Sequence, residues 1–179
     1  MKKYIVILLV FTASMAQAGL VGMGMDYVDT TYTADTQVFS MSDSGLLAVL
    51  QNDDDTQSYL TGISIELNTT YASEMTFFGG TFVISDTGGT LLAGNVIQVD
   101  FTAGATTLGG EGTAQVTTSN LAGFPVGPAD IISITFNLDP VFNGFDQDYT
   151  GDSKINFQVP EPATLALLGL GGLLLRRKK

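Results

Sequence analysis

The chain has 179 residues, of which 18 are acidic and 7 basic, and it contains no cysteine, histidine or tryptophan. It therefore cannot form disulfides, and it lacks the usual ligands of zinc sites and the base of serine and cysteine triads. Of the acidic residues only Glu161 lies outside residues 19–158, and of the basic residues only Lys154 lies inside them. This leaves 17 acids against one lysine, a formal charge of −16, which repels nucleic acid and anionic lipid.

Residues 1–18 have the pattern of a secretory signal peptide. Lys2 and Lys3 precede an apolar stretch, and Ala16 and Ala18 form a small-x-small cleavage site. We therefore predict an N-terminal signal helix that is recognised by the export machinery and removed by signal peptidase after Ala18.

Residues 19–158 form a body long enough for one domain. Apolar and polar residues alternate along 63–67, 132–138 and 155–159, and a period of two residues predicts half-buried β-strands. With the further candidates, about eight or nine strands are expected. Those further candidates are 38–41, 46–51, 80–85, 91–101 and 113–118.

The candidate strands are separated by segments rich in Gly, Asn, Asp and Pro, at 52–55, 86–89, 108–112 and 123–128. The clearest hairpin turn lies within 85–90, where glycines allow a positive φ. Short strands joined by such turns predict an all-β fold, and we expect an antiparallel β-sandwich, jelly-roll-like or immunoglobulin-like.

One segment of the body has oxygen ligands at the alternate positions typical of the start of an EF-hand calcium loop: Asp146, Asp148, Thr150 and Asp152. The second half of such a loop is missing, because its ninth and twelfth positions are Lys154 and Phe157. Two interpretations stay open. The segment is an acidic turn that leads into the last strand, or it is a calcium site of another kind. No other cofactor is expected.

Catalysis by carboxylates alone would need two acids at a set separation, and Glu66, Glu74 and Glu111 are the candidates. Nothing in the sequence places any two of them together, so we expect no enzyme activity. Aromatic side chains offer a different chemistry, a platform on which a sugar ring stacks. The tyrosines of the body are Tyr27, Tyr32, Tyr59, Tyr71 and Tyr149.

The last segment, 159–179, has the features of a membrane-handling tail. Its apolar run, 163–175, covers roughly 20 Å as a helix, which is short of the ~30 Å hydrocarbon core. The basic end that follows is expected to stay cytoplasmic, and prolines before the run would leave an accessible extended peptide outside. These flanking residues are Pro160, Glu161 and Pro162 on one side and Arg176, Arg177, Lys178 and Lys179 on the other.

The order of Pro-Glu-Pro, apolar run and basic end resembles a PEP-CTERM sorting signal. The resemblance implies recognition by an exosortase, a membrane-embedded transpeptidase-like protease of bacteria that make extracellular polysaccharide. Related tails also end some proteins labelled as ice-binding.

Three segments are therefore expected: a signal peptide at 1–18, an acidic β-sandwich at 19–158 and a PEP-CTERM segment with a short hydrophobic helix at 159–179. The expected function is that of an exported cell-surface or extracellular-matrix protein, structural or adhesive, held transiently in the inner membrane by its C-terminal segment. The alternative is a carbohydrate-binding module, calcium-assisted, that contacts extracellular polysaccharide. No nucleic-acid partner is expected.

Overall fold

The structure is a computed structural model that describes residues 20–52, 54–73, 75–103, 108–139 and 145–159. These residues form eight β-strands and no helix. The strands are β1 (Leu20–Thr33), β2 (Val38–Asn52), β3 (Gln57–Ser73), β4 (Thr76–Asp86), β5 (Gly89–Ala103), β6 (Leu108–Ser119), β7 (Ile131–Asp139) and β8 (Tyr149–Gln158).

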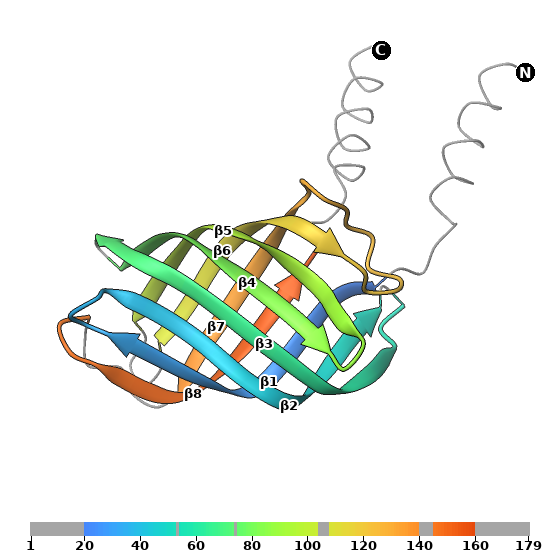
Figure 1. Cartoon of the computed structure of the whole chain (residues 1–179), viewed down its shortest axis with the longest axis horizontal. Coiled ribbons are helices and arrows are strands. Elements are labelled where there is room, and N and C mark those ends of the chain that lie inside the picture. Colours follow the sequence, from blue (N-terminus) through green and yellow to red (C-terminus); the bar gives the residue numbers. More distant parts are fainter. Residues whose placement is uncertain (1–19, 53, 74, 104–107, 140–144, 160–179) are drawn as a thin grey trace, which may run out of the picture.

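The eight strands form one closed antiparallel barrel, in which every strand pairs with its neighbour in sequence and β1 pairs with β8 (Figure 1). The all-β prediction is confirmed, but the β-sandwich prediction is wrong. A sandwich and a barrel both bury one face of every strand, so alternation along the sequence does not distinguish them. The pairing of the first strand with the last, through contacts such as Met23 with Phe157, decides between the two folds.

The alternation along β7 shows how the sequence fills the barrel. Ile132, Ile134 and Phe136 point inward and are at most 4% exposed, whereas Ser133 and Thr135 face outward. The same division holds along β8. The barrel interior is therefore a packed apolar core, and the outer face carries the polar side chains.

Several strands are longer than their alternation predicts, because a β-bulge lets a strand continue where the alternation of apolar and polar residues is interrupted. The predicted strands 38–41 and 46–51 are one strand, β2, whose register with β3 shifts between Asp43 and Leu46. In β4, Gly80 has a φ of +104°, and a Cβ there would lie 1.9 Å from the carbonyl oxygen of Asn68. Only glycine permits so close an approach of β4 to β3.

The predicted turn at 86–89 is confirmed as the β4–β5 hairpin, where a carboxylate oxygen of Asp86 accepts hydrogen bonds from the backbone of Gly88 and Gly89. The predicted break at 108–112 is wrong, because these residues belong to β6. Gly110 faces inward, and a Cβ there would lie 2.9 Å from the ring of Phe101. Glycine at this position makes room for a core ring and does not form a turn.

The two barrel ends differ in their connections. At the distal end, where β1 ends and β8 begins, a cluster of aromatic rings packs mostly edge to face. Phe145, just before β8, packs against Tyr32 and Phe77 of the barrel at centroid distances of 5.1 and 5.0 Å. The Tyr32 hydroxyl donates to the Phe145 carbonyl at 3.1 Å, and burial raises the pKa of this phenol.

At the opposite end, which we call the terminal end, β1 begins and β8 ends (Figure 1). The β6–β7 connection contains the predicted break at 123–128, and Leu121, Phe124 and Val126 of this connection are at most 8% exposed. Apolar side chains of the connecting segments thus contribute to the core at both ends of the barrel.

The two expected helices lie in segments 1–18 and 159–179, almost entirely outside the described residues. Among the residues that the structure describes, no helix is long and apolar enough to cross a membrane. The last described residue, Val159, follows β8 directly, and its backbone N–H donates to the carbonyl of Val21 at 3.0 Å.

Candidate binding surface on the outer face

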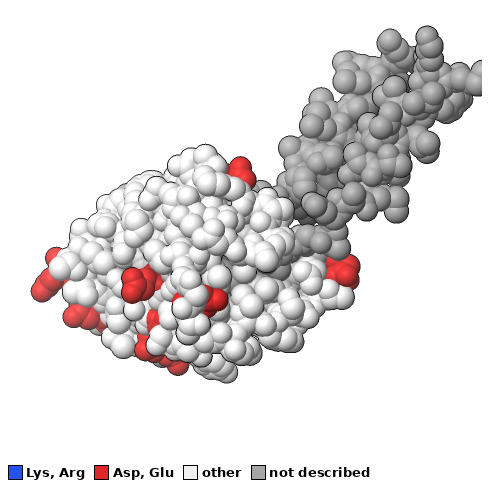
Figure 2. Space-filling view, turned by 45° about the vertical axis from the view of Figure 1, so that its right-hand side comes forward, with Lys and Arg blue, Asp and Glu red and all other residues white. Residues whose placement is uncertain are grey.

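Acidic side chains are scattered over the outer face, as one side of the barrel shows in Figure 2. Lys154 of β8 is the one basic residue in the described part of the chain. Its ammonium group lies 3.0 Å from a carboxylate oxygen of Asp26, and both side chains are about half exposed, at 52% and 53%. An ion pair this exposed contributes little stability, about 0 to 1 kcal/mol. The place of this ion pair on the surface matters more, because the pair borders a hollow.

This first hollow, of about 390 Å³, lies over β1 and β8 and extends to β2 and β3. Gly22 and Gly24 of β1 occupy alternate outward positions, so this part of the hollow has backbone where other strands present side chains. A Cβ on Gly24 would lie 2.4 Å from the amide oxygen of Asn156. The glycines thus create the depression and give room to the Asn156 side chain.

The wall formed by β2 and β3 is held by a chain of hydrogen bonds. The Tyr59 hydroxyl donates to the Gln57 side-chain oxygen at 3.4 Å, and the Gln57 amide donates to the Gln51 side-chain oxygen at 3.0 Å. The Gln51 amide in turn donates to the Asn52 carbonyl at 3.3 Å. Tyr59 is 59% exposed. This wall therefore presents oriented amide groups beside an accessible aromatic ring.

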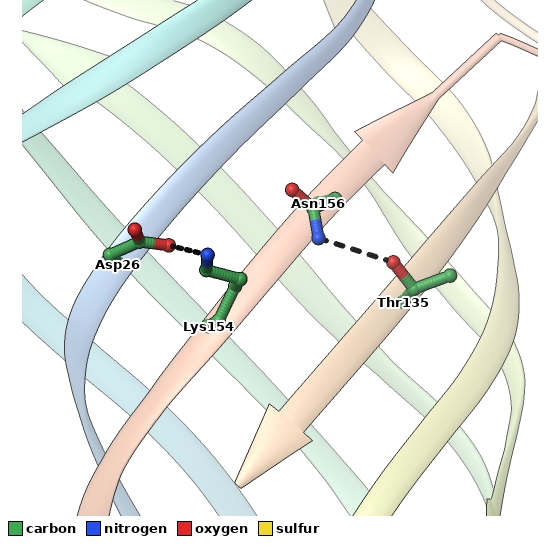
Figure 3. A network of polar contacts seen from close by, with 4 residues as sticks. All are labelled: Asp26, Thr135, Lys154 and Asn156. Atoms are coloured by element: carbon green, nitrogen blue, oxygen red, sulfur yellow. Dashed lines mark hydrogen bonds and ion pairs between the residues drawn. The ribbon is translucent and has the colours of Figure 1, made fainter. Parts of the chain in front are cut away.

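On the opposite side of the hollow, Lys154 of β8 forms its ion pair with Asp26 of β1 (Figure 3). Two residues further along β8, the Asn156 amide donates to the Thr135 hydroxyl of β7 at 3.4 Å, as Figure 3 also shows. Polar groups on both sides of the depression are thus fixed by neighbours on adjacent strands.

A second hollow, of about 580 Å³, lies over β5, β6 and β7, and Gln158 of β8 lines both hollows. It contains Asp100 and Glu111, which are direct partners across β5 and β6. The Asp100 carboxylate accepts from the Thr76 hydroxyl at 2.7 Å and from the Gln98 amide at 2.6 Å. Both carboxylates are exposed to solvent.

The carboxylates considered for hydrolysis are spread over the chain. Glu66 faces outward on β3, Glu74 lies outside the described residues, and Glu111 is the partner of Asp100. This cross-strand pair was not predicted. A glycosidase keeps one of its two acids protonated by placing it in an apolar pocket, and the surroundings of Asp100 and Glu111 are open and polar.

The residues considered for calcium are divided between a turn and a strand. Asp146 and Asp148 precede β8, and Thr150 and Asp152 face outward on it. A carboxylate oxygen of Asp148 accepts from the backbone N–H of Ala34 at 2.8 Å, which ties this turn to the β1–β2 connection. Within the described ranges no three acidic side chains form a group able to hold a metal ion. Calcium binding therefore stays a prediction.

The predicted tyrosine platform is divided as well. Tyr32 and Tyr149 are buried, Tyr71 is partly buried against the core, and Tyr27 and Tyr59 are exposed. The Tyr59 hydroxyl is hydrogen-bonded to Gln57, which lines the first hollow. The glycines and amides of that hollow were not singled out from the sequence. One sequence pattern could have indicated the glycines: Gly22 and Gly24 alternate with the apolar Met23 and Met25 along β1, which places both glycines on the outer face.

The processing residues Ala16 and Ala18, the motif Pro160 to Pro162 and the basic end 176–179 lie outside the described residues. The chain thus combines a barrel closed by the pairing of its first and last strands with a proline-bounded apolar tail that follows β8 directly in the sequence. The order of prolines, apolar run and basic end in this tail is the pattern of a C-terminal sorting signal.

A family model described as the PEP-CTERM protein-sorting motif matches residues 158–179. The predicted signal is confirmed: the chain is an exported protein with a PEP-CTERM sorting signal, which implies processing by an exosortase. No curated protein and no solved structure matches the chain.

Proposed function

We propose that this chain is a non-enzymatic structural or adhesive protein of the cell surface or extracellular matrix. The observation that carries the proposal is the distribution of side chains in the barrel. The core consists mainly of apolar residues, whereas amides, hydroxyls and carboxylates are spread over the outer face among exposed apolar side chains such as Phe78 and Ile97. A partner would therefore meet the outer wall, where polar groups are spread over a broad surface.

The sorting signal supports the proposed route to that location. The C-terminal segment would hold the protein in the inner membrane for a time, with its basic end in the cytoplasm, until the exosortase acts. The short span of the apolar run favours temporary over permanent anchoring.

The test of this route replaces Pro160, Glu161 and Pro162 together by alanine in the producing cells. The triple variant should accumulate unprocessed in the inner-membrane fraction, whereas the parent protein reaches the surface or the medium. Pro128→Ala, a change of an exposed proline in the β6–β7 connection, is the control and should be delivered like the parent. Equal delivery of the triple variant would contradict the proposal.

The second candidate function is carbohydrate binding, and the first hollow is the observation that favours it. Polar and apolar groups border it together, which is the composition that sugar-binding surfaces need. A glycan array with and without calcium, run on the exported protein, separates a binder from a structural unit. Signals that require calcium would in addition support the calcium prediction for the segment 146–152.

A further inference from the structure

We propose that the first hollow, over Gly22 and Gly24 of β1, is a binding site for a neutral polysaccharide chain. The proposal rests on the second candidate function and assigns to it a site and a class of ligand. The ligand would lie against the β1 backbone, between the amide wall of β2 and β3 and the wall formed by β8.

The depth of the site comes from the two glycines. Without side chains at these outward positions, the hollow reaches down to the backbone of β1. The volume of about 390 Å³ lies within the range of small-molecule sites, roughly 300 to 1,000 Å³. A flat outer face of a barrel would offer no such depression.

The walls match a polyhydroxylated ligand. Each of Gln51, Gln57 and Asn156 carries a neutral amide that both donates and accepts hydrogen bonds, as the hydroxyls of a sugar do. Beside them the exposed ring of Tyr59 provides an apolar face and a polar tip. The hydrogen bonds among these side chains fix their orientation before binding, which lowers the entropic cost of association.

The charge of the protein favours a neutral ligand over an anionic one. With 17 acids against one lysine between residues 19 and 158, the barrel repels anions. The single cation at the site, Lys154, is already paired with Asp26 at 3.0 Å. An acidic polysaccharide would have to displace that carboxylate and overcome the field of the others.

Gly22→Val is the most direct test. The backbone of Gly22 is not in the left-handed region, and a Cβ there would make ordinary contacts with the Phe157 carbonyl oxygen at 3.4 Å and with Gln158 Cγ at 3.7 Å. The valine side chain would thus point outward into the hollow, away from the core. Gly109→Val on β6 is the matched control. Gly109 also faces outward, has neighbours no closer than 3.9 Å, and lines neither hollow.

The measurement is isothermal titration calorimetry of the exported protein. The probes are neutral hexasaccharides of glucose, xylose and mannose, the neutral extracellular polysaccharide of the producing cells, and oligogalacturonate as the anionic comparison. We expect at least one neutral probe to bind and oligogalacturonate to bind at least tenfold more weakly. Gly22→Val should weaken binding of the neutral probe at least tenfold, and Gly109→Val should leave it within twofold of the parent.

A second variant, Tyr59→Ala, changes an exposed side chain and should weaken the same binding at least threefold. Absence of binding to every neutral probe, tighter binding of oligogalacturonate, or equal affinities of the parent and Gly22→Val proteins would overturn the proposal. Melting curves of all variants verify that the barrel is folded. Normal surface delivery of a protein that fails these tests would leave the structural role standing without this site.

Discussion

The backbone N–H of Val159 donates a hydrogen bond to the carbonyl oxygen of Val21 at 3.0 Å. This bond continues the ladder between β8 and β1 by which the barrel closes. Pro160, the first residue of the sorting motif, follows in the sequence with no spacer. The chain therefore passes from the barrel-closing strand directly into the signal that directs its delivery.

We predict from this closure that truncation after Val159 leaves the barrel stable and that truncation after Gln147 does not. A chain of residues 19–159 keeps all strand pairs and should melt within about 2 °C of the chain that retains the tail. Removal of β8 takes Ile155 and Phe157 from the core and leaves β1 and β7 each with one neighbour in an open sheet, so cooperative unfolding should be lost. Circular dichroism melts test both results. A cooperative melt without β8 would contradict the closed barrel.

Two adjacent residues of β4 provide a test of which face is buried. Phe77 is 0% exposed and contacts several rings of the distal end, whereas Phe78 is 49% exposed. Phe77→Ala should lower the free energy of unfolding by about 3 to 5 kcal/mol because it leaves a cavity in the core. Phe78→Ala should change it by no more than about 0.5 kcal/mol. Urea unfolding gives both values, and similar losses for the two variants would refute the orientation of β4.

A pair of buried hydroxyls gives a third prediction. Thr30 Oγ1 and Ser153 Oγ lie 2.6 Å apart, and the Val28 carbonyl oxygen lies 2.9 Å from the first and 3.3 Å from the second. Each hydroxyl has one proton, so one hydroxyl donates to the other, which donates to the Val28 carbonyl. Thr30→Val and Ser153→Ala should each cost about 1 kcal/mol of unfolding free energy. The double variant should cost less than the sum, because the two groups share their partners. A double-mutant cycle in urea measures this coupling, and strictly additive costs would show that the hydroxyls do not interact.

The β2–β3 turn gives a prediction about pH. The Thr56 hydroxyl and its backbone N–H donate to a carboxylate oxygen of Asp54 at 2.5 and 3.0 Å, and these bonds lower the pKa of Asp54 below its ordinary value of 3.8. Since the folded pKa is lowered, the stabilisation is present above this ordinary value, which the unfolded chain has, and is lost as pH falls through the folded value.

Thr56→Val removes the hydroxyl, which is the larger cause, and should raise the pKa of Asp54 towards its ordinary value. A ¹³C NMR titration of the side-chain carboxyl measures it. Thr61→Val, on the exposed face of β3, is the control and should leave the Asp54 titration unchanged. An Asp54 titration curve that is the same in Thr56→Val and in the parent would count against this assignment.

Much of the strand content was predictable from local patterns. The alternation at 132–138 identified β7 because each inward position there is apolar, and the glycines at 88 and 89 marked a true hairpin. Local patterns predicted turns wrongly where a glycine lies inside a strand and makes room for a neighbouring residue. Gly112, like Gly110, was interpreted as part of a turn, yet a Cβ on Gly112 would lie 2.5 Å from the Gln98 carbonyl oxygen of the neighbouring strand.

The candidate site could not be predicted because its parts come from opposite ends of the chain. Gly22 and Gln51 belong to the first two strands, and Asn156 belongs to the last. They meet only because β8 pairs with β1, and this long-range pairing leaves no trace in the alternation of either strand. The sorting signal was predictable for the opposite reason, since its whole pattern lies within one continuous segment.

We expect the chain to be exported, to form a closed barrel and to be released from its C-terminal segment. Intact-mass spectrometry of the protein recovered from the surface of the producing cells tests this expectation most directly. We expect the mass of a chain that begins at Gly19, after cleavage behind Ala18, and that has lost Arg176 to Lys179. A protein that retains residues 1–18, or that is found only in the inner membrane with its basic end attached, would contradict the account.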